Sequence, residues 1–348
     1  MNKILNKKYL IAACACLLVM LAVVYFYFFA ALSAKSDTVY VLVDQDDTID
    51  SVLVKVAAEA DQRQMSGLKT LIRHSSYSEH IRTGRYAIRP GEGAYVVFRH
   101  LKNGQQTPLR LTLPSVRTLD RLAAELGTRL MADSAEWQRS FTDTALCQRL
   151  GVDTATLACL LIPNTYDIYW NTTPEKFLER MKTESDRFWE GDRDAKAARL
   201  RLTRQQVITL ASIIDEETAN NAEKPMVAGM YYNRLMLRNA EYPDGMPLQA
   251  DPTIKYAWRR FDLKRIYHNL LSIDSPYNTY KNTGLPPGPI RIASVAGIDA
   301  VLDLKHHNYL YMCAKEDFSG THNFATTYQE HQVNARRYSE ALNKRGIK

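Results

Sequence analysis

The stretch that decides the fold of this chain is residues 203–218, TRQQVITLASIIDEET. Thr203 followed three residues later by Gln206 is the pattern of a capping box, so we expect a helix to begin here. Apolar residues then recur at helical spacing and predict a stripe that faces the core: Val207, Leu210, Ala211 and Ile214. The helix ends on three consecutive acids, which makes its last turn unusual.

The three acids are expected to face different surroundings. Glu217 lies two helical turns after Leu210 on nearly the same face, whereas Asp215 points to the opposite side and Glu216 lies between them. Burial disfavours a charged carboxylate and raises its pKa, which is what a general acid requires. Read alone, a solvated acidic turn is the more ordinary interpretation of such a run. The rest of the chain decides between the two.

An uncharged apolar run extends from Tyr9 to Leu32. It exceeds the ~20 residues that a membrane-spanning helix needs. Positive charge favours the cytoplasmic side, and lysines precede the run at positions 3, 7 and 8. The alternative is a cleaved signal peptide, whose apolar core would be shorter. We therefore predict residues 1–8 in the cytoplasm, a span over 9–32, and the remainder outside the cytoplasm of an (inner) cell membrane.

Composition and charge place the rest of the chain among ordinary globular proteins. The chain has 348 residues, 46% of them hydrophobic and 24% charged, which favours two or three domains. The net charge is +7, and subtracting the three N-terminal lysines leaves +4. Such a mild excess suits an anionic wall polymer or a membrane surface but is too weak to indicate nucleic acid.

The cysteines and histidines give no sign of a metal or cofactor. Cys147, Cys159 and Cys313 lie outside the apolar run and could form at most one disulfide. Their irregular spacing indicates neither a metal site nor a disulfide framework, and the histidines show no ligand spacing either. We expect no metal and no cofactor.

The pattern of apolar residues and turns predicts an α+β fold. A small module at 35–113 is expected to hold strands at 38–43, 84–88 and 107–113 and helices at 51–59 and 94–101. A larger mixed α/β domain at 114–348 is expected to hold a loop at 160–170, a strand at 309–314, and helices at 118–126, 137–150, 174–190, 203–217, 224–237 and 294–304 and from 327. The stretch between 237 and 294 is expected to be rich in loops, whose amide, hydroxyl and aromatic groups would suit a sugar.

Six motifs occur in a fixed order: ASIIxxET (211–218), NRL (233–235), LQxDPT (248–253), YNTY (277–280), GLPPGxI (284–290) and GxHxF (320–324). Together they resemble the bacterial membrane-anchored endolytic murein transglycosylases, the YceG-like family. The resemblance covers residue 84 to the C-terminus and is strongest over 203–331. Residues 84–113 also resemble the LysM-like module of that family.

The resemblance implies an enzyme that cuts glycan strands of peptidoglycan within the chain, leaves a 1,6-anhydro-N-acetylmuramic end and limits strand length during wall assembly. It places the single catalytic glutamate at Glu217. It implies substrate binding by the side chains that match the motifs: Gln249, Asp251, Thr253, Asn278, Tyr280 and His322. Glycan strands, the membrane and cell-wall synthases are the partners it implies, and nucleic acid is not among them.

Two alternatives stay open at this point. One is a muramidase that uses water, which needs a second carboxylate, and Asp251 is the main rival for that role. The other is a non-catalytic wall-binding scaffold for cell division. The chain also departs from the family at Glu216, where the family commonly carries lysine. A neighbouring negative charge should raise the pKa of Glu217 further.

Overall fold

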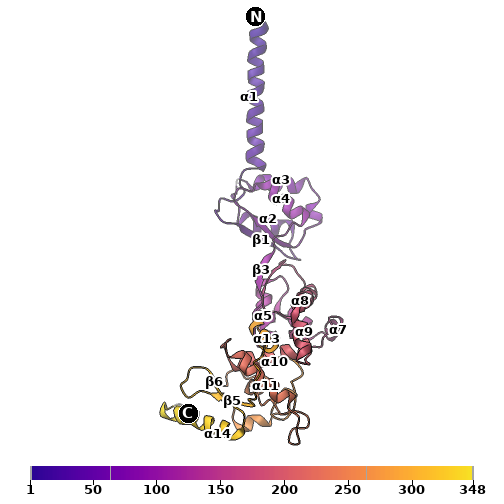
Figure 1. Cartoon of the computed structure of the whole chain (residues 1–348). Coiled ribbons are helices and arrows are strands. Elements are labelled where there is room, and N and C mark those ends of the chain that lie inside the picture. Colours follow the sequence, from indigo (N-terminus) through magenta and orange to yellow (C-terminus); the bar gives the residue numbers. More distant parts are fainter. Residues whose placement is uncertain (1, 63, 264, 347–348) are drawn as a thin grey trace. The chain divides into compact units, whose positions relative to one another are not determined.

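The computed structural model describes residues 2–62, 64–263 and 265–346 as a mixed α+β protein (Figure 1). Its residues cluster into two compact units. The first comprises Met1–Leu111, Arg129–Ala132 and Asp167–Thr173, and the second comprises Thr112–Thr128, Asp133–Tyr166 and Pro174–Lys348. The sequence predicts a single boundary after residue 113, whereas two later segments also belong to the first unit.

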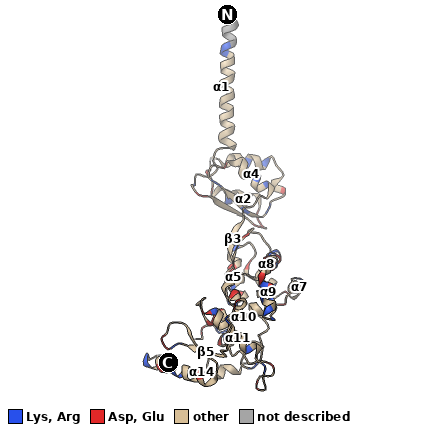
Figure 2. Ribbon diagram, viewed as in Figure 1, with Lys and Arg blue, Asp and Glu red and all other residues tan. Residues whose placement is uncertain are grey.

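The first unit begins with one long apolar helix, α1 (Asn2–Phe28). Its segment Lys7–Phe28 is long and apolar enough to cross a membrane, and Figure 2 shows no charged residue along most of its length. The helix ends four residues before the predicted end of the span. Leu32 is instead fully buried in the module core, where its backbone N–H donates to Glu92 O (2.8 Å) and its O accepts from Asp61 N–H (2.8 Å).

The remainder of the first unit is a pair of antiparallel strands packed with helices. β1 (Val39–Val43) pairs with β2 (Gly84–Ile88), with Val39 opposite Ile88. The helices are α2 (Ile49–Ala57), α3 (Met65–Arg73) and α4 (Ala94–Asn103), and a 3-10 turn, η1, covers Tyr77–Glu79. The observed bounds of β1, β2, α2 and α4 agree with the predictions to within two residues at every end.

Helix α3 is an element that the sequence prediction missed. The segment mixes polar and apolar residues, but Met65, Leu68 and Ile72 recur at helical spacing and are all buried in the core of the module. The strand predicted at 107–113 forms only over β3 (Leu109–Thr112).

The second unit opens with helices α5 (Leu119–Arg129), α6 (Ser134–Thr142), α7 (Thr144–Arg149) and α8 (Pro174–Trp189). The predicted helix at 137–150 is broken because Asp143 caps α7, accepting from the N–H groups of Ala145 (2.9 Å) and Leu146 (3.1 Å). The loop predicted at 160–170 is wrong in part, since β4 (Thr165–Ile168) forms there with Tyr166 and Ile168 buried. The 3-10 turn η2 covers Leu157–Leu160.

Helix α10 (Arg204–Glu217) is the centre of the second unit. It contacts α9 (Asp192–Arg199), α11 (Lys224–Met236), α12 (Asp251–Ala257) and α13 (Val295–Leu302). The stretch between 237 and 294, predicted to be rich in loops, contains α12, which Asp251 begins with Pro252 in its first turn. It also contains the 3-10 turn η3 (His268–Ser272).

A hairpin and a terminal helix complete the unit. β5 (Tyr311–Ala314) pairs antiparallel with β6 (His322–Ala325), so that Ala314 lies opposite His322. Helix α14 (Tyr328–Lys344) packs against both strands. Its N-terminus carries a capping box between Thr327 and Glu330, as a helix beginning near Thr327 requires.

Candidate active site

The predicted start of α10 is confirmed in detail. Thr203 Oγ1 accepts from Gln206 N–H (3.2 Å), and Gln206 Oε1 accepts from Thr203 N–H (2.9 Å). The next part of the helix, residues 207–214, is entirely buried. The helix ends at Glu217, and Thr218 is extended. A buried helix segment therefore leads directly to three acids at one end of the core.

Each of the three acids has its own partner. Asp215 accepts from Lys224 Nζ (2.7 Å) and from the backbone N–H and hydroxyl of Ser294 (2.6 and 2.8 Å). Gly297 lies so close that a Cβ there would be 2.6 Å from Asp215 Oδ1. Glu217 has a different neighbour, since the Tyr231 hydroxyl donates to its Oε1 (2.6 Å). The predicted separation of Asp215 from Glu217 is confirmed.

Glu216 corrects one expectation. Its carboxylate accepts from Arg117 Nε (2.9 Å) and from Arg291 Nη1 (2.9 Å), so two guanidinium groups neutralise it. The main influences on the pKa of Glu217 are its burial, the hydrogen bond from Tyr231 and the charges of Asp251 and two nearby cations. Contrary to the sequence prediction, Glu216 is not a main cause of the raised pKa of Glu217.

This arrangement predicts the result of restoring the residue that the resembled family carries. Glu216→Lys places a third cation between Arg117 and Arg291, so we expect it to lower the melting temperature of the protein. The pH at which activity falls should be the same in Glu216→Lys as in the wild type. Glu216→Gln is the matched control, because it removes the carboxylate without adding a charge. A Glu216→Lys protein that melts like the wild type would contradict this account.

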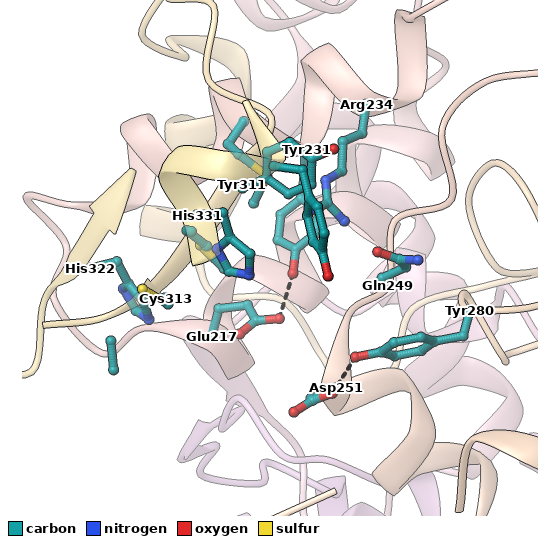
Figure 3. Close-up of a pocket in the computed structure, with 14 residues that line it drawn as sticks. Glu217, Tyr231, Arg234, Gln249, Asp251, Tyr280, Tyr311, Cys313, His322 and His331 are labelled. Atoms are coloured by element: carbon teal, nitrogen blue, oxygen red, sulfur yellow. Dashed lines mark hydrogen bonds between the residues drawn. The ribbon is translucent and has the colours of Figure 1, made fainter. Parts of the chain in front are cut away.

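Glu217 lines a cavity of about 330 Å³ (Figure 3). Burial raises the pKa of Glu217 to about 7, and the negative charge of Asp251 acts in the same direction. The hydrogen bond from Tyr231 and the charges of Lys255 and Arg234 oppose the rise. Glu217 is therefore expected to keep its proton to a higher pH than an ordinary glutamate, which is suitable for a general acid.

Four of the predicted site residues lie with Glu217 in this cavity: Gln249, Asp251, Tyr280 and His322. The Tyr280 hydroxyl donates to Asp251 Oδ1 (2.6 Å), as the second dashed line in Figure 3 shows. Asp251, the candidate for a second catalytic carboxylate, is thus in the site, and it accepts a hydrogen bond from Tyr280. Burial raises the pKa of Tyr280 well above its ordinary value, so this hydroxyl keeps its proton.

Thr253 and Asn278 lie outside the cavity lining and are fully buried. Thr253 Oγ1 bonds to Ala250 O (2.6 Å) and to the hydroxyl of Thr279 (2.8 Å). The Asn278 amide donates to the carbonyls of Leu271 and Ile273 (2.9 and 2.8 Å). The predicted substrate-binding role does not fit these two positions, because their side chains are buried and their contacts fix loops next to the site.

Gln249 lies in a strained backbone conformation. Its φ is 50°, in the left-handed region that residues other than glycine rarely adopt. Its backbone N–H donates to Thr279 O (3.0 Å), and the neighbouring Ala250 N–H donates to Thr279 Oγ1 (3.0 Å). Strain of this kind persists where the surroundings enforce it, commonly at functional sites.

The sequence prediction missed the cavity residues of helix α11. Tyr231 binds Glu217, and Arg234 lies three residues later on the same face of the helix. The Arg234 guanidinium donates to the carbonyls of Leu310 (2.5 Å) and Leu248 (2.7 Å), joining the hairpin to the loop before α12. The i, i+3 spacing of Tyr231 and Arg234 on one helix face was the available signal.

The hairpin and α14 supply the other wall of the cavity, including Tyr311, Cys313, Tyr328 and His331. The Tyr311 and His331 rings stack with centroids 5.4 Å apart. Cys147, Cys159 and Cys313 are free thiols. No group of three or more metal-ligating side chains occurs in the part of the chain that the structure describes.

Comparison with known proteins shows a consistent set of relatives. The sequence model of the YceG-like family matches residues 41–337. A Bacillus subtilis (strain 168) protein named endolytic murein transglycosylase is 34% identical over 186 residues, 53% of this chain and 49% of that protein. A Streptococcus pneumoniae (serotype 2) protein of the same name is 26% identical over 293 residues, 75% of this chain and 51% of that protein. The chain spans about half the length of these curated relatives.

The fold has a counterpart among solved structures. A crystal structure of a yceG-like protein from Listeria monocytogenes matches with a TM-score of 0.54 and 24% identity. The match covers 86% of this chain and 99% of that chain. At this level of identity the likeness concerns the fold alone.

Proposed function

The chain belongs to the YceG-like family, and from this premise we propose that it is an endolytic peptidoglycan transglycosylase with Glu217 as its single catalytic acid. The observation that carries the proposal is a carboxyl group with its pKa raised to about 7 inside a cavity lined by polar side chains. The names of the curated relatives support the substrate class. The proposed substrate is the MurNAc–GlcNAc bond of nascent glycan strands.

In the proposed reaction Glu217 first donates a proton and then accepts one. Protonated Glu217 donates its proton to the glycosidic oxygen while the bond from that oxygen to the muramic C1 breaks. The muramic C6 hydroxyl attacks C1 and loses its proton to the Glu217 carboxylate, which restores the acid. The product carries a 1,6-anhydro ring and no water is consumed. An internal nucleophile has a large proximity advantage, so a second catalytic carboxylate is unnecessary.

Tyr231 and Asp251 have distinct parts in this scheme. Because Tyr231 holds Oε1 of Glu217, the other oxygen is the one that carries the transferred proton. Asp251, Tyr280 and Gln249 would bind sugar hydroxyls on the opposite wall. A water-using muramidase would instead need Asp251 as its second carboxylate. The hydrogen bond from Tyr280 favours a binding role for Asp251, because it holds Oδ1 of that carboxylate in place.

Two substitutions are expected to shift the pH dependence of kcat/KM in opposite directions. In the wild type, kcat/KM should fall by about tenfold per pH unit above pH ~7, as Glu217 loses its proton. Tyr231→Phe removes a hydrogen bond that lowers the Glu217 pKa, so this basic limb should move to higher pH. Asp251→Asn removes a charge that raises the pKa, so the limb should move to lower pH. Shifts in the same direction, measured as kcat/KM against pH, would exclude Glu217 as the titrating acid.

We further propose that α1 is a single-pass anchor, with its N-terminal end in the cytoplasm and the residues after it outside. The absence of charged residues from Tyr9 to Phe28, within the apolar segment Lys7–Phe28, supports this proposal. A reporter enzyme fused after Lys348 should be active only outside the cytoplasm, and the mature chain should retain its N-terminal residues. A soluble mature form that begins near Ser33 would identify a signal peptide instead.

Residues 35–113 are proposed to act as a LysM-like glycan-holding module and 114–348 as the catalytic domain. An open groove between α2 and α3 supports the first assignment, because apolar and charged side chains line it, among them Ile49, Asp50, Leu53, Lys69 and Arg73. A second weak site on the same chain raises the effective concentration of glycan at the catalytic cavity. Lys69→Glu with Arg73→Glu should therefore weaken the cutting of long strands more than of short fragments. If the double substitution weakened the cutting of long strands and of short fragments equally, the module would act only as a spacer.

A further inference from the structure

A second carboxylate, Glu223, is buried beside the cavity but does not line it. It lies at the N-terminus of α11, and its contacts reach two other elements. Its Oε1 accepts from His322 N–H (2.6 Å). Its Oε2 accepts from the Thr218 hydroxyl (3.0 Å) and lies 3.1 Å from His322 Nδ1. One carboxylate thus joins the residue after Glu217 to the first residue of β6.

The surroundings of Glu223 determine the proton position on His322. Thr218 Oγ1 already accepts from Asn220 N–H (3.1 Å), so its own hydrogen is directed to Glu223. The backbone N–H of His322 is also a donor. A carboxylate that receives these donors is an acceptor, so the neutral His322 ring carries its hydrogen on Nδ1. Nε2 is then a bare acceptor.

The opposite nitrogen of the ring is available to a ligand. His322 lines the same cavity as Glu217 (Figure 3). Within residues 2–62, 64–263 and 265–346, no group forms a hydrogen bond with its Nε2. The other cavity histidine, His331, has no carboxylate partner of this kind among those residues, and its ring stacks on Tyr311.

From this geometry we infer that Glu223 is a positioning residue, which fixes His322 in the Nδ1–H tautomer so that Nε2 accepts a hydrogen bond from the bound glycan. The donors that a glycan offers are its hydroxyl and acetamido N–H groups. The inference rests on the proposed function for the identity of the ligand, but the tautomer does not depend on it. The tautomer is set by a second residue, as in other carboxylate–histidine pairs.

Glu223→Gln tests the inference because an amide reverses one hydrogen bond. Its oxygen can still accept from His322 N–H, but its NH₂ group must donate to Nδ1, and the ring hydrogen then moves to Nε2. The ¹⁵N spectrum of the histidine-labelled full chain in detergent micelles, at a pH well above the usual histidine pKa, reports which nitrogen is protonated. His322→Ala assigns the signal, because it removes it. We expect hydrogen on Nδ1 in the wild type and on Nε2 in Glu223→Gln.

Affinity for glycan is measured separately, in chains that also carry Glu217→Gln so that no cutting occurs. Peptide-free glycan strands prepared from sacculi are the probe. Loss of one well-formed hydrogen bond should weaken binding by about fivefold to tenfold in Glu223→Gln and in His322→Ala. His322→Ala leaves the Glu223 contacts with Thr218 and the backbone, so it tests the same point if Glu223→Gln does not fold. Glu316→Gln is the matched control, since Glu316 holds the next residue of the hairpin, Asn323 (2.8 Å).

Three results would overturn the inference. Hydrogen on Nε2 in the wild type would show that Glu223 does not set the predicted tautomer. A swapped tautomer with unchanged glycan affinity would show that Nε2 does not contact the ligand. Equal weakening by Glu316→Gln would show a general effect on the hairpin. A wild-type chain that binds glycan but does not cut it would refute the proposed function and leave this inference standing.

Discussion

Glu217→Gln is expected to abolish glycan cleavage while the protein stays folded. The amide is nearly isosteric and can still accept the hydrogen bond from Tyr231, but it has no proton to donate to the leaving oxygen. Loss of a general acid reduces the rate by ~10²-fold or more. The melting temperature should not fall, because the substitution removes a titrating group from a buried position. Cleavage of sacculi and thermal melting are measured on the same preparation.

Glu216→Gln is the control for this prediction. It changes the neighbouring carboxylate on the same turn, which binds Arg117 and Arg291 and faces away from the cavity. We expect it to retain cleavage. A folded but inactive Glu216→Gln protein, next to an active Glu217→Gln protein, would move the catalytic role to Glu216.

Asp215→Ala is expected to have the largest effect on stability. Asp215 and Lys224 form an ion pair whose side chains are 3% and 7% exposed. Removing one partner leaves a buried ammonium group without its counter-charge, and such losses cost about 3–5 kcal/mol. The backbone N–H of Ser294 at the start of α13 also loses its acceptor. Urea unfolding of the full chain in detergent micelles measures the change in unfolding free energy.

Asp303→Ala is the matched control for the ion pair. Its partner is Lys196, and both side chains are well exposed compared with Asp215 and Lys224. Water and salt screen such a pair, so the unfolding midpoint should change little. If both substitutions had the same small effect, the Asp215–Lys224 pair would not hold α10 to α11 and α13.

The sequence predicted those elements whose signals are local. The capping box of Thr203 and Gln206, the apolar stripe after it and the strand at 84–88 were all visible as spacing. Helix α3 was missed although Met65, Leu68 and Ile72 recur at helical spacing, because polar residues separate them. Strand β4 has only four residues, too few for periodicity to distinguish it from a loop. The first unit also includes residues 129–132 and 167–173, which no local pattern could indicate.

The candidate site was predictable in part for the same reason. Helical periodicity separated Glu217 from Asp215, and the sequence motifs brought Asp251 and Tyr280 into consideration. The partners of each acid were not predictable. Glu216 seemed to be a negative charge acting on Glu217, and only the tertiary structure shows Arg117 beside it. Tyr231 was missed because a buried tyrosine on an apolar helix is ordinarily core.

The measurement that tests the central claim most directly is mass spectrometry of purified sacculi digested with the chain, beside a digest with the Glu217→Gln variant. If Glu217 works alone and the C6 hydroxyl is the nucleophile, the new ends are 1,6-anhydro-N-acetylmuramic residues, and the variant produces none. Because no water is consumed, heavy-oxygen water should leave no label in these ends. Reducing muramic ends labelled from that water would contradict the claim and point to a muramidase that uses Asp251 as its second carboxylate.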